Sequence, residues 1–141
     1  MPSASEASSL ISSVPMFSGL DERHRKELAA QGKEISYKPG ATVVSEGAMG
    51  VGFFLVLEGK AEVRSKGKVL ATLSKGQFFG EMSLIDDSPR SADVVAIEPT
   101  KCWAITSWAF ASVIKSNPEI AMGMLKEVVK RLRKAQSSPT S

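Results

Sequence analysis

The stretch VGFFLVLEGKAEVRSKGKVLATL, residues 51–73, combines two patterns that are typical of β-strands. Its first part, VGFFLVL, is apolar on both alternating faces, as expected for a central strand inside a closed roll. Its second part alternates apolar residues at odd positions with charged residues at even positions on either side of Gly67. This period of two predicts a hairpin with one dry face and one wet face. The dry face contains Ala61, Val63, Val69, Ala71 and Leu73.

The strand character extends outward from this stretch, over residues 33–106. Glycines punctuate the region every seven to twelve residues, at Gly40, Gly47, Gly59, Gly67 and Gly76. Such spacing is typical of the short strands of a sandwich or barrel. Helical signals lie on either side, because Asp21 can cap DERHRKELAAQ before Gly32 and Ser107 can cap SWAFASVIK. We therefore expect a mainly β fold with flanking helices.

A final helix is predicted from Pro118, which suits a first helical turn. Its large apolar residues recur at helical spacing and define one stripe. They are Ile120, Met124, Leu125, Val128 and Leu132. A basic cluster occupies the opposite side, near the C-terminal end, where cations interact favourably with the helix dipole. We interpret this cluster as a solvated face, because nucleic-acid binding usually needs a wider basic surface with aromatic residues.

The composition is that of one ordinary globular domain. The chain has 141 residues, of which 43% are hydrophobic and 23% are charged, and this balance lies within the globular range. We expect disordered serine-rich tails at residues 1–9 and 137–141 around a single domain at residues 10–136. No apolar stretch approaches the ~20 residues of a membrane span, and the N-terminus lacks a secretory signal. We therefore expect a cytoplasmic protein without membrane contact.

The chain offers few residues for catalysis or metal binding. Its one cysteine, Cys102, is expected to be a small buried hydrophobe, and its one histidine, His24, is expected to face solvent. Neither a clustered metal site nor a Ser-His-Asp or Cys-His set is evident. We therefore predict no metal site and no enzymatic activity.

The segment FGEMSLIDDSPRSADV, residues 79–94, carries the candidate binding residues. Gly80 lets the backbone approach a ligand closely, and the N–H groups around Met82 and Ser83 would begin a short helical turn that can attract an anion. The carboxylate of Glu81 would repel a bare phosphate in the same place. Glu81 is therefore useful only if the ligand also presents a hydroxyl group beside its phosphate.

Arg90 lies at the other end of this loop and supplies a planar fork of donors that matches two phosphate oxygens. Pro89 fixes the backbone before it, and Ser91 and Ala92 are small enough to let the chain come close. A nucleotide whose phosphate is cyclised onto its own ribose would suit both Arg90 and Glu81. The alternative is a surface ion pair between these two side chains, which would imply no ligand.

The stretch from Phe79 to Ala92 resembles the phosphate-binding cassette of cyclic nucleotide-binding domains, the family of the catabolite activator protein and the regulatory subunits of cAMP-dependent protein kinase. Further landmarks of that family follow in order: PMF at 15–17, YKPG at 37–40, EG at 46–47, FF at 53–54 and EG at 58–59. The resemblance implies a β-roll, a double-stranded β-helix or jelly-roll, with N-terminal helices and C-terminal hinge and lid helices. It implies cAMP as the ligand, with cGMP as the alternative.

The resemblance also assigns roles to single residues. Glu81 would accept a hydrogen bond from the ribose 2′-OH, Arg90 would clamp the cyclic phosphate, and Ser91 could add a hydroxyl group to that phosphate. Leu84 would couple the cassette to the hinge helix. Candidates for a lid over the purine are Arg131, Leu132 and Arg133. The implied site comprises Gly80, Glu81, Met82, Ser83, Pro89, Arg90, Ser91 and Ala92.

Three residues depart from the usual pattern of the family. Ala48 and Val51 stand where acidic turn residues are common, and Asp93 stands where a β-branched residue is more usual. These departures concern the conformation of the loops, because none of the three residues belongs to the implied ligand contacts.

Two other functions stay open beside that of a cyclic-nucleotide sensor. An interaction module could keep the roll without its ligand and dock, or form a homodimer, through the last helix. A DNA-binding regulator is disfavoured, because only five residues follow Gln136 and they are too few for a DNA-reading motif. A sensor would act on an effector protein or output domain that the sequence does not identify.

Overall fold

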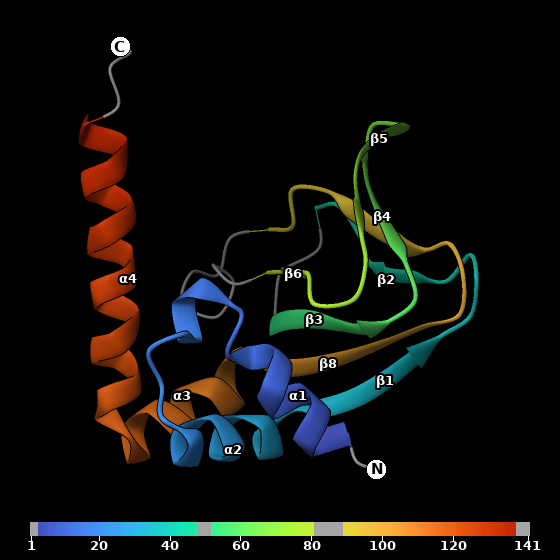
Figure 1. The fold of residues 1–141 in the computed structure, drawn as a ribbon. Coiled ribbons are helices and arrows are strands. Elements are labelled where there is room, and N and C mark those ends of the chain that lie inside the picture. Colours follow the sequence, from blue (N-terminus) through green and yellow to red (C-terminus); the bar gives the residue numbers. More distant parts are fainter. Residues whose placement is uncertain (1–2, 48–51, 81–88, 138–141) are drawn as a thin grey trace.

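The computed structural model shows a β-roll flanked by helices and describes residues 3–47, 52–80 and 89–137 (Figure 1). The N-terminal helices are α1 (Ser3–Ile11), the 3-10 helix η1 (Pro15–Phe17) and α2 (Glu22–Gln31). The strands are β1 (Lys33–Tyr37), β2 (Thr42–Val44), β3 (Gly52–Glu58), β4 (Ala61–Ser65), β5 (Lys68–Leu73), β6 (Phe78–Phe79), β7 (Asp93–Ala96) and β8 (Thr100–Thr106). The C-terminal helices are α3 (Ser107–Ser116) and α4 (Pro118–Ser137). The predicted mainly β fold with flanking helices is confirmed.

Within the described residues, the strands form two antiparallel four-stranded sheets, ordered β1-β8-β3-β6 and β2-β7-β4-β5. β3 is an interior strand that pairs with both β8 and β6. Its residues Phe53, Leu55, Val56 and Leu57 are fully buried, so both faces of this strand are covered. This confirms the interpretation of the all-apolar run as a central strand. No helix among the described residues is long and apolar enough to cross a membrane.

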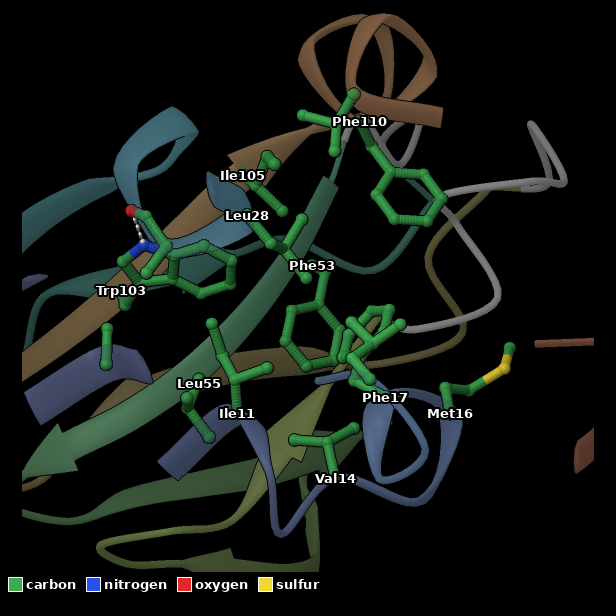
Figure 2. Packing of buried hydrophobic residues seen from close by; sticks show 14 of the residues in the cluster. Ile11, Val14, Met16, Phe17, Leu28, Phe53, Leu55, Trp103, Ile105 and Phe110 are labelled. Atoms are coloured by element: carbon green, nitrogen blue, oxygen red, sulfur yellow. Dashed lines mark hydrogen bonds between the residues drawn. The ribbon is translucent and has the colours of Figure 1, made fainter. Parts of the chain in front are cut away.

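The main hydrophobic core lies between the β1-β8-β3-β6 sheet and the helices (Figure 2). Phe17 of η1 packs edge-on against Phe53 of β3, with ring centroids 5.7 Å apart, and also contacts Phe110 of α3 at 6.0 Å. The indole Nε1–H of Trp103 in β8 donates a 2.9 Å hydrogen bond to the backbone oxygen of Ala29 in α2. These contacts fix the N-terminal helices and α3 against the sheet whose edge strand, β6, leads to Gly80.

The predicted dry face of the hairpin is wrong for β5. Val69 is 54% exposed although it occupies an apolar odd position, and its neighbour Leu70 is 61% exposed. β5 is the edge strand of its sheet, and Figure 1 shows the β4–β5 hairpin projecting from the body of the molecule. Both faces of β5 therefore meet solvent, whereas Ala61 at the base of the hairpin is buried as predicted.

The helix boundaries differ from the sequence analysis in two places. α2 has the predicted caps, Asp21 and Gly32. The N-cap of α3 is Thr106 rather than Ser107, because the Thr106 hydroxyl accepts a 3.2 Å hydrogen bond from the N–H of Ala109. α1 begins within the segment that was expected to be a tail, and its residue Ala7 is fully buried. The described part of that segment is therefore helical.

The expectation that His24 faces solvent is wrong, since this side chain in α2 is buried. Its Nδ1 lies 2.9 Å from Oδ1 of Asp21, and its Nε2 lies 3.8 Å from Oε1 of Glu119 in the first turn of α4. The start of α4 thus lies against a part of α2 that was expected, from its charged sequence ERHRKE, to be exposed to solvent. That packing joins residues almost a hundred positions apart, so the local pattern could not reveal it.

Cys102 behaves as predicted and is buried in β8, with 1% of its surface exposed. Burial raises the pKa of its thiol to about 11, because the apolar surroundings disfavour the thiolate. At neutral pH this cysteine is therefore a protonated packing residue.

Asp21 stabilises the start of α2 in a pH-dependent way, and the replacement Asp21→Ala tests this. Its carboxylate accepts a 2.9 Å hydrogen bond from the backbone N–H of His24, which lowers the pKa of Asp21 below its usual 3.8. A lowered folded-state pKa contributes stability above the unfolded-state pKa, and this contribution is lost as the pH falls through the folded-state value. We expect Asp21→Ala to lower the thermal unfolding midpoint at pH 7, by an amount that shrinks below about pH 4.

The control is Asp21→Asn, which keeps a good N-cap but cannot ionise. It should retain most of the stability at pH 7 and lose the acid dependence that comes from position 21. Identical unfolding midpoints for the wild type and Asp21→Ala at pH 7 would contradict the capping role.

Candidate functional site

Gly80 and Arg90, from the two ends of the candidate loop, lie beside each other in the structure. β6 ends at Phe79, and Gly80 then adopts a φ of +84°, in the left-handed region that favours glycine. A Cβ atom on Gly80 would lie 2.5 Å from Nη1 of Arg90 and 2.6 Å from the backbone oxygen of Gly52. Position 80 therefore requires glycine for two reasons, its backbone conformation and its close approach to the guanidinium.

The guanidinium of Arg90 is held by a carbonyl group and an aromatic ring. Its Nη2 donates a 2.7 Å hydrogen bond to the backbone oxygen of Gly52, at the start of β3. Its Cζ lies 5.8 Å from the centroid of the Phe54 ring, within the range of a cation–π contact. Phe54 itself stacks on Phe79 of β6, with centroids 4.9 Å apart and planes 4° from parallel. These contacts orient the side chain.

The backbone around Arg90 is tied to the turn that contains Glu46 and Gly47. The N–H of Gly47 donates a 2.8 Å hydrogen bond to the backbone oxygen of Arg90. The N–H of Glu46 donates to Oδ1 of Asp93 at 2.6 Å. Asp93, which departs from the usual pattern of the family, therefore has a structural role here, because its carboxylate fixes the turn against the strand that follows Arg90.

The electrostatics around Arg90 favour an anion. The side chain is partly buried, and desolvation lowers the pKa of its guanidinium below the usual value for arginine. An arginine nevertheless stays charged at neutral pH. The acceptor that Gly52 provides is a neutral carbonyl group, so this contact does not cancel the positive charge. A partly desolvated cation of this kind interacts more strongly with a phosphate than an exposed one.

The structure brings together some of the predicted site residues and leaves the positions of others open. Gly80 and Arg90 meet, whereas Pro89 and Ser91 are exposed and Ala92 is partly buried on the same short segment. Outside the described residues lie Glu81, Met82, Ser83, the relay candidate Leu84 and the departures Ala48 and Val51. For Glu81, Met82, Ser83 and Leu84, the roles given by the resemblance remain predictions.

Sequence reasoning missed Gly52 and the stacked pair of Phe54 and Phe79 as parts of this site. Gly52 is 38 residues from Arg90 along the chain, and a backbone carbonyl group leaves no mark in the sequence. The apolar run from residue 51 predicted a strand, which accounts for Phe54 as a packing residue. The antiparallel register that pairs Phe54 with Phe79 is what brings the ring under the guanidinium.

More than half of the chain matches the model of a known protein family. Residues 34–117 match the family model described as the cyclic nucleotide-binding domain. The chain therefore belongs to the family of cyclic nucleotide-binding domains, and the resemblance predicted from its sequence is confirmed. Its relatives include regulatory subunits of cAMP-dependent protein kinase and a cyclic AMP receptor protein of Thermus thermophilus.

Individual relatives place the chain within that family. A cAMP-dependent protein kinase regulatory subunit of Schizosaccharomyces pombe is 34% identical over 127 residues, which cover 84% of this chain and 31% of the relative. A cGMP-dependent protein kinase of Plasmodium berghei is 32% identical over 126 residues, covering 89% of this chain and 14% of the relative. The chain thus spans less than a third of the length of either protein.

A solved structure is similar over almost the whole chain. The crystal structure of the N-terminal domain of a transcriptional regulator from Streptomyces coelicolor A3(2) aligns with a TM-score of 0.86 and 29% sequence identity. The alignment covers 94% of this chain and 95% of that one. The similarity therefore includes the flanking helices as well as the strands.

Proposed function

We propose that this chain binds cAMP between Gly80 and Ala92, with the cyclic phosphate on Arg90. The observation that carries the proposal is the guanidinium of Arg90, partly buried and already held at Gly52 and Phe54. A preorganised cation needs little reordering when it receives a phosphate, so more of the interaction energy becomes binding affinity. Because residue 80 is a glycine, no side chain stands between its backbone and the guanidinium.

The remaining residues of the loop complete the proposed contacts. The carboxylate of Glu81 accepts a hydrogen bond from the ribose 2′-OH, and backbone N–H groups of Gly80, Met82 and Ser83 point to ribose or phosphate. The hydroxyl of Ser91 adds a hydrogen bond to the phosphate, and its exposure leaves it accessible to a ligand. Pro89 restricts the backbone on one side of these contacts, and the small side chain of Ala92 lets the chain come close on the other side.

The choice between cAMP and cGMP is a separate part of the proposal. One of the relatives is named as a cAMP-dependent and another as a cGMP-dependent kinase protein. The hydroxyl of Ser91 can bind either a phosphate or a guanine base, so it does not separate the two nucleotides. We propose cAMP, and titration calorimetry of the purified chain with each nucleotide tests the preference. Heat of binding with cGMP but not with cAMP would overturn this preference.

We further propose that occupancy is reported by movement of α3 and α4. Asn117 stands between these helices, and its Nδ2 donates hydrogen bonds to Oε2 of Glu27 at 2.8 Å and to the backbone oxygen of Val113 at 3.1 Å. Beyond this junction, α4 contacts the core through Ile120 and Met124, which are buried. A ligand that binds one arrangement of α4 more tightly than another would shift the population toward it.

Limited proteolysis with trypsin tests this movement. The lysines and arginines of α4 provide cleavage sites, and Lys126, Lys130 and Arg133 are exposed in the present structure. We expect saturating cAMP to slow cleavage in α4 several-fold relative to cleavage in the β4–β5 hairpin, which serves as the internal control. Cleavage of α4 at the same rate with and without nucleotide would contradict the movement while leaving the binding proposal intact.

The proposed function is binding without catalysis, in the cytoplasm. The relatives that match along most of this chain share its regulatory domain. The sequence also predicts neither a metal site nor a catalytic group. A single buried thiol suits a reducing compartment. The effector protein or output domain that would receive the signal belongs to the same proposal.

A second candidate function, a protein-interaction module that uses the last helix, is favoured by one observation. Leu125 and Leu132 of the predicted apolar stripe are 57% and 55% exposed, respectively. The two functions are compatible, because this exposed surface is on α4 and the candidate ligand contacts are on the loop between β6 and β7.

A further inference from the structure

α4 carries a continuous row of exposed apolar side chains, here called the α4 ridge. The row consists of Met122, Leu125, Val129 and Leu132, which are 55%, 57%, 46% and 55% exposed. Their spacings of three, four and three residues place them along one side of the helix, as in the seam of a coiled coil. Single exposed apolar residues are ordinary, but an aligned row of four marks an interaction surface.

The ridge is exposed because α4 is anchored through another side. Ile120 and Met124 are buried against the core, close to η1. Glu127, also on the anchored side, has a side chain only 16% exposed and accepts a 3.2 Å hydrogen bond from Nε of Arg131. Figure 1 shows the C-terminal half of α4 extending past η1, away from α3. The helix therefore keeps its position while the ridge has no apolar cover in the described structure.

Positive charges lie along one edge of the ridge. Lys126 and Arg133 follow Met122 and Val129 by four residues, so each is the next neighbour of a ridge residue on the helix surface. A shallow hollow of about 440 Å³ is lined by Met122, Leu125, Lys126, Val129, Lys130 and Arg133. No carboxylate lines this hollow, whereas Glu119 and Glu127 border the neighbouring hollow beside η1 together with Met122, Lys126 and Lys130. The first hollow is therefore apolar and basic at once.

We propose that the α4 ridge docks an amphipathic helix of a partner protein that carries acidic residues along one edge. Its apolar face would cover Met122, Leu125, Val129 and Leu132, and its carboxylates would pair with Lys126, Lys130 and Arg133. This is the helix-on-groove mode of recognition, in which apolar anchors supply affinity and flanking charges choose the partner. The proposal does not depend on nucleotide binding.

Charge complementarity favours this occupant over a second copy of the chain. A second α4 brings the same three cations to the hollow and no carboxylate among its lining residues. In an antiparallel pair of α4 helices, the two basic edges would face each other and repel. In a parallel pair, each basic edge would face the apolar edge of the other helix, which contains Val128. Either arrangement leaves the cations without an anion. An anionic membrane is less well matched, because the cations flank only one edge of the ridge.

The test uses fluorescence anisotropy with two synthetic 21-residue helical peptides as probes. Both have leucine at the seam positions, and the flanking positions carry glutamate in one peptide and lysine in the other. We expect the whole chain to bind the glutamate peptide at least tenfold more tightly than the lysine peptide, with an affinity that falls as salt rises. The triple variant K126E/K130E/R133E should reverse this preference.

Two control variants separate the ridge from general charge effects. Leu125→Ser with Val129→Ser should abolish binding of the glutamate peptide, and both positions are exposed, so the fold should tolerate the changes. The variant K33E/K60E/K68E makes the same change of net charge at exposed lysines elsewhere and should bind as the wild type does. Thermal unfolding of each variant checks that it is folded.

Three results would overturn the proposal. The first is equal binding of the two peptides. The second is a wild-type homodimer in sedimentation equilibrium that Leu125→Ser with Val129→Ser dissociates, which would assign the ridge to a second copy. The third is binding to phosphatidylserine vesicles without binding to either peptide, which would assign it to a membrane. Nucleotide affinity should be unchanged in Leu125→Ser with Val129→Ser and in K33E/K60E/K68E, so failure here leaves the proposed ligand untouched.

Discussion

Replacing Arg90 with alanine is expected to weaken the binding of cAMP by ~2 to 5 kcal/mol. The phosphate would keep its charge in a partly buried place and lose the cation that faces it. The loss should be large because the guanidinium is partly buried and is oriented by Gly52 and Phe54. Little of the interaction is then spent on ordering a long side chain. Titration calorimetry of the wild type and the variant measures the difference directly.

Two further variants show whether the effect belongs to this guanidinium. Arg90→Lys keeps the charge but not the planar fork of donors, so its affinity should fall between those of the wild type and Arg90→Ala. Arg64→Ala removes an arginine whose recorded partner is Glu62, at 2.7 Å on β4, and should leave nucleotide binding unchanged. An Arg90→Ala variant that is folded and binds cAMP with wild-type affinity would refute the assigned role.

Replacing Gly80 with alanine is expected to damage both the fold and the site. The φ of +84° would cost an L-residue about 1 to 2 kcal/mol. The new Cβ atom would also lie 2.5 Å from Nη1 of Arg90 and 2.6 Å from the oxygen of Gly52, and overpacking of this kind typically costs about 1 to 3 kcal/mol. The guanidinium has to move away, so nucleotide affinity should fall by tenfold or more together with stability.

Gly67→Ala provides a matched control for Gly80→Ala. Gly67 also has a positive φ, +80°, but no atom lies within 4 Å of where its Cβ would be. This variant should show the cost of the backbone conformation without the clash. Calorimetry and thermal unfolding on both variants separate the two effects. If Gly80→Ala binds cAMP as well as Gly67→Ala does, the close approach between Gly80 and Arg90 has no functional consequence.

The sequence predicted those elements whose burial follows from local pattern. The all-apolar sequence of β3 predicts a central strand, and its neighbours do cover both of its faces. α2 has its cap signals within its own sequence. β5 was predicted less well, because an alternating pattern does not tell whether anything covers the apolar side of an edge strand. The burial of His24 depends on α4, which begins far away along the chain.

The candidate site shows the same division between local and long-range information. The types of residue at Gly80 and Arg90 indicated an anion site, and the structure places these two residues together. The contacts that orient the guanidinium come from Gly52 and Phe54, which reach it through sheet pairing rather than through any spacing in the sequence. The tie between Asp93 and Glu46 is likewise visible only in three dimensions.

The most direct test of the central claim is a crystal structure of the purified chain grown with saturating cAMP. We expect the cyclic phosphate within hydrogen-bonding distance of the Arg90 guanidinium and the ribose 2′-OH at the carboxylate of Glu81. The same crystal would show whether backbone N–H groups from Gly80 onward face the phosphate or ribose. Clear density for cAMP elsewhere on the molecule, or crystals that stay free of nucleotide at millimolar cAMP, would contradict the claim.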